Sequence, residues 1–335
     1  MIPLPQYVDH AEKKQNFQLH LIETEEDYDA FYASAKSRKG LYRGIGDAGY
    51  KIYTSLQRQW IQKELSGNYN FDAFVRKYLL ETKSDPLLSK FFEALKLSKS
   101  FPALFSFLQH YGAPTTLLDF TGNVDVALYF ATEKLPAFHP AGNISDYFSV
   151  FFIAEEDIEL LSYNKAIEGI KNMQEQWSGF FQGADMFEQY IDQYIEMSTE
   201  KIFLVDHQPE NMTVYNALNN VNILAQGGLF IYNGYPDKPL ELALREFFKD
   251  AARFQYSIHD DLVGPESQAI NDEYFNVTLP RNRAFQERLE KNIINSYEIN
   301  KTLLPYIQSK GLLTKEEIYP NLNDRTWNIF ERSLK

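Results

Sequence analysis

The pattern of hydrophobic and polar positions predicts helices that alternate irregularly with single short strands. From Asn68 to about Gly112, apolar residues recur every three or four positions, as they do in amphipathic helices. Uninterrupted apolar runs of strand length follow at "YFSVFFIA" (147–154) and "KIFLV" (201–205). Because the strands come singly between helices of uneven length, we predict an α+β fold with a central mixed or antiparallel sheet flanked by helices.

Two segments are predicted to stand apart from the central domain. Residues 1–40 form a helical lead-in, in which Thr24 would cap a helix and Gly40 would end it. Residues 156–199 are acidic and helical in pattern, and we interpret them as an insertion that is either a solvated helical face or a surface for a protein partner. The central domain then spans residues 41–335.

The stretch "LYRGIGDAGYKI" contains G-x-G-x-x-G, the spacing of a dinucleotide-binding turn, at Gly44, Gly46 and Gly49. That spacing has this meaning only between a buried strand and a helix. Here Arg43 interrupts the strand, and no acidic residue ends a second strand about twenty positions later, where a ribose contact is expected. We therefore predict another use, in which the glycines let the backbone turn tightly or approach a ligand beside Arg43.

The composition narrows the class of protein. Hydrophobic residues make up 44% of the 335 residues and aromatic residues 15%, which suits a globular core. A formal net charge of −13 opposes non-specific binding of nucleic acid but allows a local basic pocket for an anionic small molecule. Without cysteine the chain has no disulfide or thiolate chemistry, and its scattered histidines lack metal-ligand spacing. Because we find neither a signal sequence nor an apolar run long enough to cross a membrane, we expect a cytoplasmic protein.

Three separated segments carry a resemblance to a known family. They are "LYRGIGDAGYKIYTSLQR", "LQHYGAPTTLLDFTGNVDVALYFAT" and "ILAQGGLF". Together they resemble the FRG domain of bacteria and phages, named for its F/Y-R-G motif, over about Tyr42 to Leu322. The chain departs from the family pattern at Thr116, where an Arg is frequent, and at Asn222, close to where many members carry an Arg.

The resemblance implies a nucleotide site, because the order of elements is similar to a remote ADP-ribosyltransferase fold, whose enzymes use NAD. By that similarity Arg43 would meet the NAD phosphates, the strand of Asp119 would follow, and Gln226 would stand where those enzymes have a catalytic Glu. His110, in the Q-H-Y-G motif, is a candidate general acid or base. The remaining motif residues are expected to bind the nucleotide: Tyr42, Gly44, Arg58, Gln109, Tyr111, Thr115 and Thr121.

The residues themselves leave two functions open. An Arg inside a strand needs a negative partner, which is either a ligand phosphate or Asp119. Gln226 is neutral and cannot oppose the positive charge of the transition state, so either Asp119 supplies that charge or the domain binds without catalysis. The first candidate is an NAD-dependent ADP-ribosyltransferase-like enzyme, active or degenerate. The second is a non-catalytic interaction module whose motif residues form a structural network.

Overall fold

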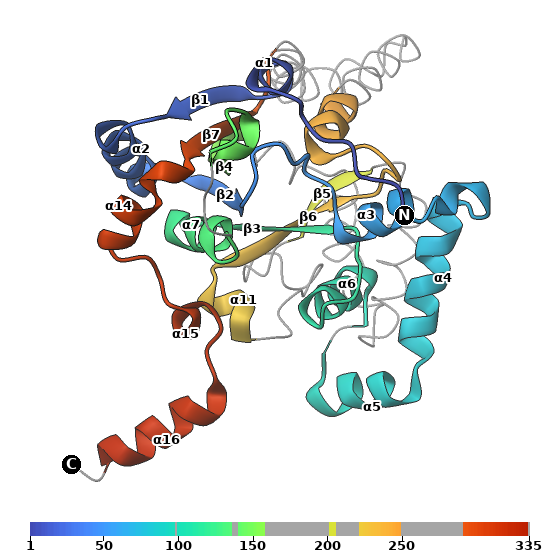
Figure 1. The fold of residues 1–335 in the computed structure, drawn as a ribbon. Coiled ribbons are helices and arrows are strands. Elements are labelled where there is room, and N and C mark those ends of the chain that lie inside the picture. Colours follow the sequence, from blue (N-terminus) through green and yellow to red (C-terminus); the bar gives the residue numbers. More distant parts are fainter. Residues whose placement is uncertain (98, 136–139, 158–200, 206–220, 249–290, 334–335) are drawn as a thin grey trace, which may run out of the picture.

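The computed structural model describes residues 1–97, 99–135, 140–157, 201–205, 221–248 and 291–333 (Figure 1). The predicted insertion at 156–199 lies, apart from its start, outside these residues, so its helical structure and its proposed partner remain predictions. The predicted division at residue 40 also remains a prediction.

The described strands form one mixed sheet, which confirms the predicted α+β class. Its seven strands run in the order β1-β7-β4-β2-β3-β6-β5. β1 is parallel to β7, and every other neighbouring pair is antiparallel. The strands are β1 (Gln18–Ile22), β2 (Gly40–Ile45), β3 (Leu117–Thr121), β4 (Tyr147–Ala154), β5 (Ile202–Val205), β6 (Gly228–Asn233) and β7 (Ile294–Asn300).

Helices lie over both faces of this sheet (Figure 1). Thr24 caps the second helix in a capping box with Asp27, as predicted, but the helix ends at Arg38. Gly40, predicted to end it, is the first residue of β2 because it pairs with Ala154 of β4. The helices are α1 (His10–Lys14), α2 (Glu25–Ser37), α3 (Ser55–Gln62), α4 (Phe71–Ser84), α5 (Pro86–Leu95), α6 (Phe101–His110), α7 (Val124–Thr132), α11 (Val221–Ala225), a helix over 240–248, α14 (Leu304–Ser309), α15 (Lys315–Ile318) and α16 (Leu322–Ser333), with short 3-10 turns at Leu65–Gly67, Ile144–Asp146 and Lys301–Leu303. No helix within the described ranges is long and apolar enough to span a membrane.

One face of the sheet is covered by the N-terminal segment and the helix over 240–248. Leu118 and Phe120 of β3 and Phe151 of β4 belong to the same buried cluster as Tyr7 and that helix. Burial of such side chains is the main term that holds a sheet and its covering layer together.

The opposite face carries two separate groups of helices. α2, α7 and α14 pack over β2, β4 and β7, in a cluster that includes Tyr28, Ala127 and Phe152. α3, α4, α5 and α6 pack over β3, β5 and β6, in a cluster that includes Trp60 and Phe203. The boundary between β2 and β3 therefore lies between the two groups of helices.

β2 and β3 are joined over a short distance. Among the described residues they pair at one position, Tyr42 opposite Thr121, whereas β2 pairs with β4 from Gly40 to Ile45. Beyond that pair each strand keeps its other neighbour, β4 or β6, and the two strands separate. The sheet is split at the point where β2 carries Arg43 and β3 carries Asp119.

A fully buried ion pair ties α1 to β7. The Nζ atom of Lys13 lies 2.8 Å from Oε1 of Glu298, and both side chains are 0% exposed. Nζ also donates to the Ala48 carbonyl and to the Ser149 hydroxyl, each at 2.8 Å. The Ser296 hydroxyl donates to the same Glu298 oxygen. Every ammonium proton of Lys13 thus has a partner, as a buried charge requires.

Candidate functional site

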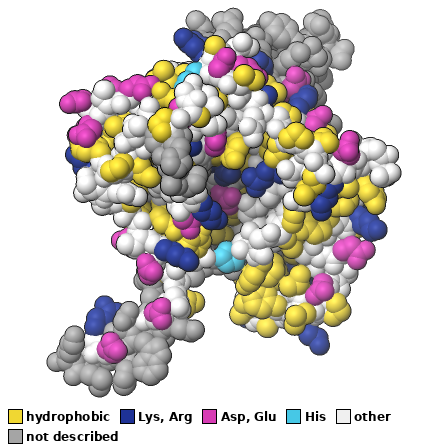
Figure 2. All heavy atoms as spheres, viewed as in Figure 1, with side chains coloured by type: hydrophobic (Ala, Val, Ile, Leu, Met, Phe, Trp, Pro, Cys, Tyr) yellow, Lys and Arg dark blue, Asp and Glu magenta, His cyan; other side chains and the backbone are white. Residues whose placement is uncertain are grey.

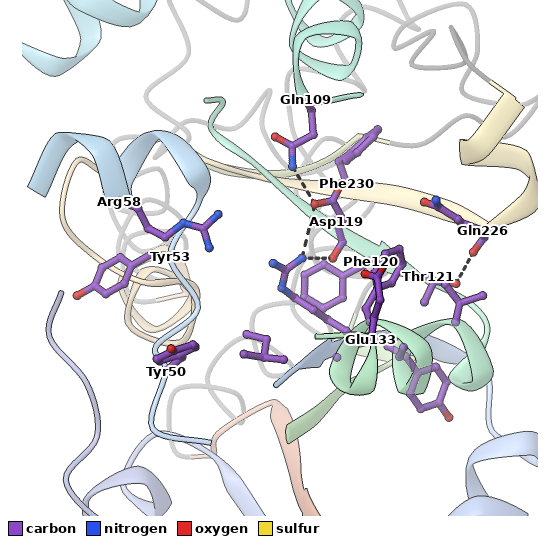
Figure 3. A pocket seen from close by; sticks show the side chains of 18 of the residues that line it. Tyr50, Tyr53, Arg58, Gln109, Asp119, Phe120, Thr121, Glu133, Gln226 and Phe230 are labelled. Atoms are coloured by element: carbon purple, nitrogen blue, oxygen red, sulfur yellow. Dashed lines mark hydrogen bonds and ion pairs between the residues drawn. The ribbon is translucent and has the colours of Figure 1, made fainter. Parts of the chain in front are cut away.

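A cavity of about 870 Å³ opens at the split in the sheet (Figure 3). Its walls come from residues 3–6, β2, the loop before α3, α3 itself, the end of α6, β3, α7, residues 222–230 and Tyr319. On the face of the molecule seen in Figure 2, basic and acidic side chains gather in a central hollow bordered by apolar surface. The volume lies within the range of natural small-molecule sites, roughly 300–1,000 Å³.

Arg43 lies in the cavity wall with part of its guanidinium unused. Nη1 donates to the Asp119 main-chain oxygen at 2.5 Å and lies 3.8 Å from Oδ2 of Asp119. Nε is buried and has no hydrogen-bond partner in the described part of the chain. Burial lowers the pKa of Arg43 and the charge of Asp119 raises it, but a guanidinium stays protonated in proteins. The cavity wall thus holds a permanent cation, and the donor that it leaves unused, Nε, is buried.

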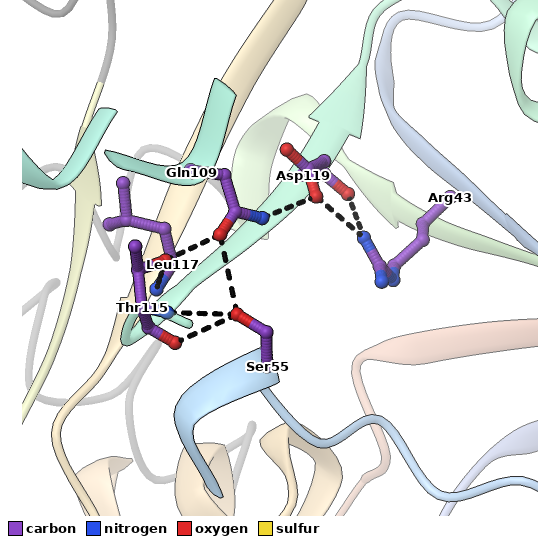
Figure 4. Close-up of polar contacts among 6 residues, drawn as sticks. All are labelled: Arg43, Ser55, Gln109, Thr115, Leu117 and Asp119. Carbon is purple, nitrogen blue, oxygen red and sulfur yellow. Dashed lines mark hydrogen bonds and ion pairs between the residues drawn. The ribbon is translucent and has the colours of Figure 1, made fainter. Parts of the chain in front are cut away.

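Asp119 is held from the other side by a polar network (Figure 4). The Gln109 amide Nε2 donates to Oδ2 of Asp119 at 2.8 Å. Oε1 of Gln109 accepts from the Thr115 hydroxyl at 2.5 Å and faces the Ser55 hydroxyl at 3.4 Å. Ser55 in turn accepts from the Thr115 backbone N–H at 2.9 Å. Asp119 is therefore fixed by neighbours from α6 and β2, while 55% of its side chain stays exposed.

Arg58 supplies a second cation from α3. Its side chain forms no hydrogen bond or ion pair with any residue that the structure describes, and Figure 3 shows it directed toward the cavity. Loss of hydration lowers the pKa of Arg58 and the charge of Asp119 raises it. The positive charge of Arg58 also lowers the pKa of Arg43. Two guanidinium groups and one carboxylate therefore line the same cavity, and the carboxylate is paired with Arg43.

These groups fall in a segment that matches a known family. A family model for the FRG domain matches residues 38–139. Residues 38–139 are an FRG domain. The match spans β2, α3–α7 and β3, and it includes Arg43, Arg58, Gln109 and Asp119. No curated protein and no solved structure matches the chain.

The resemblance extends further along the chain than the family match does. The segment around Gln226 and the tail near Leu322, which complete the predicted coverage, lie outside residues 38–139. The structure nevertheless places Gln226 in the wall of the cavity that the FRG domain helps to form. The FRG domain and its C-terminal continuation share one pocket.

Most of the predicted site residues meet at this cavity. His110 is exposed at its rim, and desolvation lowers the pKa of its imidazole. The predicted residues that line the cavity are Tyr42, Arg43, Gly44, Arg58, Gln109, His110, Asp119, Thr121 and Gln226. Their individual roles in binding or catalysis remain predictions.

Two predicted residues do not line the cavity. Tyr111 follows the last residue of α6, is 66% exposed and packs on the ring of Phe107. Thr115 is fully buried behind the cavity wall, where its hydroxyl serves Gln109. Any effect of Thr115 on a ligand is therefore indirect.

Three residues of the cavity wall are already engaged in holding the fold. The Tyr42 hydroxyl donates to the Ala35 carbonyl at 2.9 Å, so the tip of the ring is tied to α2. The Thr121 hydroxyl donates to the Gln226 carbonyl at 2.6 Å and accepts from the Asn123 N–H. Asn123 caps α7, the helix that follows. The Gln226 side-chain amide donates to the carbonyl of Ile318, the last residue of α15, at 3.2 Å.

The glycines of the opening motif separate into different uses. A Cβ at Gly44 would lie 1.8 Å from the Ala127 carbonyl oxygen, so this glycine lets β2 and α7 pack closely. Gly44 also lines the cavity, so the close approach of its backbone to a ligand stays a prediction. Gly49 does make a tight turn, in which its N–H donates to Asp47. Since both neighbours of β2 are antiparallel, the motif is not a dinucleotide-binding βαβ turn.

Part of the cavity wall carries no signal in the sequence motifs. Tyr50 and Tyr319 are exposed aromatic residues from loops, and no local pattern marked them. Phe130 and Glu133 lie four and seven positions after Val126 on α7, so one face of that helix, with a period of 3.6, points to them. Glu133 adds a second carboxylate to the cavity and accepts from the Tyr129 hydroxyl at 3.0 Å.

Proposed function

We propose that the cavity binds a nucleotide and that the protein is an ADP-ribosyltransferase-like enzyme with NAD as its substrate. The observation that carries this proposal is that two guanidinium groups, Arg43 and Arg58, line the same cavity as the Asp119 carboxylate. Lys51 and Lys134 also line the cavity, so four basic side chains face two carboxylates, Asp119 and Glu133, and leave a local excess of positive charge in a chain whose net charge is −13. Such a pocket favours an anion.

The shape of the donors favours a phosphate among anions. A guanidinium presents planar, paired donors that suit phosphate oxygens, and Figure 3 shows the Arg58 side chain directed toward the cavity. Tyr50, Phe130 and Tyr319 give the cavity aromatic walls, on which a planar base can stack. A nucleotide combines a phosphate with such a base.

The reaction proposed for this site breaks the bond between nicotinamide and ribose, so that nicotinamide leaves and the ribose carbon bonds to water or to a nucleophile of an acceptor, which loses a proton. A positive charge develops on the ribose in the transition state, as it does in glycoside hydrolysis, and a fixed negative charge stabilises it. Gln226 cannot provide that charge because its amide is neutral. We assign this role to Asp119, whose carboxylate is fixed and faces the cavity.

One observation favours the alternative of a non-catalytic interaction module. Arg43, Asp119, Gln109, Thr115 and Ser55 already hydrogen-bond or pair with one another without a ligand. A network of this kind can serve the fold alone. The two functions predict different effects for Arg58, because its side chain lines the cavity but takes no part in the network. A change at Arg58 should therefore affect ligand binding and leave the network intact.

The proposal is tested by ligand-dependent melting temperature and by release of nicotinamide. ADP-ribose and NAD are added separately to the wild-type protein, to Arg43→Ala and to Arg58→Ala. Lys77→Ala is the matched control, since it removes one exposed positive charge from α4, outside the cavity. We expect ADP-ribose to stabilise the wild type and Lys77→Ala, and each arginine substitution to weaken binding about tenfold or more.

Two results would count against it. If neither compound at millimolar concentration shifts the melting temperature, the cavity is not a site for this nucleotide class. If Arg58→Ala keeps the full shift, the second cation plays no part. Binding without nicotinamide release would favour a degenerate enzyme over an active one.

A further inference from the structure

We propose that Gln109 is a positioning residue, which fixes the Asp119 carboxylate so that Oδ1 accepts a hydrogen bond from a ligand hydroxyl. This inference rests on the proposed function for the identity of the ligand. It adds that the bound group carries hydroxyls beside its phosphate, as the ribose phosphate part of a nucleotide does.

The direction of the Gln109 amide follows from its neighbours. The Thr115 hydroxyl accepts from the Leu117 N–H at 3.2 Å, so its proton is free to donate, and it lies 2.5 Å from Oε1 of Gln109. The Ser55 hydroxyl likewise accepts from a backbone N–H, and its one proton faces both Oε1 at 3.4 Å and the Thr115 carbonyl oxygen at 3.3 Å. With its oxygen held by the Thr115 hydroxyl, the amide presents its NH₂ group to Asp119.

The opposite orientation of the amide is unfavourable. It would bring Oε1 to the place of Nε2, 2.8 Å from Oδ2 of Asp119, where two acceptors would face each other. An ionised Asp119 therefore keeps the amide in its orientation, and the amide keeps Oδ2 of Asp119 in place. Gln109 and Asp119 hold each other in one arrangement.

The two oxygens of Asp119 differ in their surroundings. Oδ2 faces both Gln109 Nε2 at 2.8 Å and Arg43 Nη1 at 3.8 Å. Oδ1 accepts no hydrogen bond from the residues that the structure describes, and 55% of the side chain is exposed at the cavity. A carboxylate oxygen is an acceptor only, so its partner must be a donor such as a hydroxyl. Arg43 and Arg58 beside it select an anion, and the two demands together fit a sugar phosphate.

The network also joins the elements that carry the site. Ser55 is the first residue of α3, the helix of Arg58, and Thr115 stands just before β3, the strand of Asp119. Gln109 lies in the last turn of α6. The hydrogen bonds of one amide thus fix the carboxylate relative to the helix that bears the second cation.

A double-mutant cycle tests whether Gln109 acts through Asp119. Binding of ADP-ribose is measured by calorimetry for the wild type, Gln109→Met, Asp119→Ala and the double variant. We expect Gln109→Met to weaken binding about tenfold in the wild type and less than about twofold in the Asp119→Ala background. Equal losses in both backgrounds would overturn the proposal, because they would indicate a general structural effect.

A second variant approaches the same amide from its far side. Thr115→Val keeps the shape of the side chain but removes the hydroxyl that holds Oε1. We expect a smaller loss of ADP-ribose binding than in Gln109→Met, and again none beyond the loss of Asp119→Ala alone. If Thr115→Val has its full effect in the Asp119→Ala background, Thr115 does not act through this carboxylate.

A measurement without ligand separates this inference from the proposed function. The side-chain NH₂ protons of Gln109 are followed by NMR in the wild type and in Asp119→Ala. Slow exchange with solvent in the wild type, lost in Asp119→Ala, would support the positioning role even if ADP-ribose does not bind. The same exchange rate in both proteins would overturn it even if ADP-ribose does bind.

Discussion

Two of the ion pairs in the protein, Lys13–Glu298 and Arg43–Asp119, differ in almost every physical respect. Lys13 and Glu298 are 2.8 Å apart and fully buried, with every ammonium proton engaged. Arg43 and Asp119 are 3.8 Å apart, with side-chain exposures of 17% and 55%. The first pair joins the N-terminal segment to β7, and the second faces a cavity at the split between β2 and β3.

The comparison shows how the same charges serve stability in one place and are left available in another. A buried pair with all hydrogen bonds made has nothing left for a ligand, but removing one partner leaves the other charge buried and alone. A loose and exposed pair contributes little to stability. In the pair of Arg43 and Asp119, Oδ1 of Asp119 has no partner among the described residues and can accept a hydrogen bond from a ligand that enters the cavity.

Breaking the buried pair of Lys13 and Glu298 should have the largest effect on stability. In Lys13→Met, Glu298 loses its partner in the core, and we expect the free energy of unfolding to fall by about 3–5 kcal/mol. Urea denaturation measures this change. Lys36→Met is the control, because the pair of Lys36 with Asp125 is partly exposed and should cost less than about 1 kcal/mol. A loss as small as the control's would show that the buried pair is not needed for the fold.

The second largest effect on stability should come from disturbing the packing of α7 on β2, the strand of Arg43. Gly44→Ala places a methyl group 1.8 Å from the Ala127 carbonyl oxygen, and the helix must move away. We expect a loss of about 1–3 kcal/mol in urea denaturation. Gly122→Ala is matched to it, since a Cβ there meets nothing within 4 Å. Equal stability of the two variants would show that α7 yields without cost.

The stability of the protein should also depend on pH through Glu241, a buried carboxyl that is influenced by the charge of Lys13. Burial raises the pKa of this carboxyl above its ordinary value of 4.5, while hydrogen bonds from Tyr7 and Ile52 and the charge of Lys13 partly oppose the rise. A carboxyl with a raised pKa contributes stability fully below pH 4.5 and loses it as the pH rises through its native pKa. The melting temperature of the wild type should therefore fall relative to Glu241→Gln from pH 4.5 upward. Parallel curves for the two proteins would exclude this linkage.

Breaking the partly exposed pair of Arg43 and Asp119 should change stability least. In Asp119→Asn the remaining amide oxygen can still accept from Gln109, and the lost charge was half exposed. We expect the free energy of unfolding to change by less than about 1 kcal/mol. A loss as large as that of Lys13→Met, measured in the same way, would make Arg43 and Asp119 a structural pair and would favour the interaction module.

The motifs predicted the members of the site better than their roles. Arg43, Arg58, Gln109 and Asp119 come from two segments of the chain, and the fold brings them to one cavity together with Gln226. The need of an Arg in a strand for a negative partner was visible from the sequence alone. The partner is in part a main-chain oxygen of Asp119, which no side-chain pattern could indicate.

The rest depended on contacts between distant parts of the chain. The tight fit at Gly44 exists because α7 crosses β2 there, and spacing within the glycine motif cannot show that crossing. Tyr111 was expected to bind a ligand, but it lies one residue beyond α6 and turns to solvent. Lys13 and Glu298 stand near opposite ends of the chain, so their pairing had no local signal.

The position of β2 and β3 in the middle of the sheet has a consequence for anyone who wishes to produce the FRG segment by itself. A fragment of residues 38–139 would contain these two strands without β4 on one side and β6 on the other. Two bare strand edges attract other strands, so such a fragment should aggregate upon expression. The transferable unit for protein engineering is the whole seven-stranded sheet.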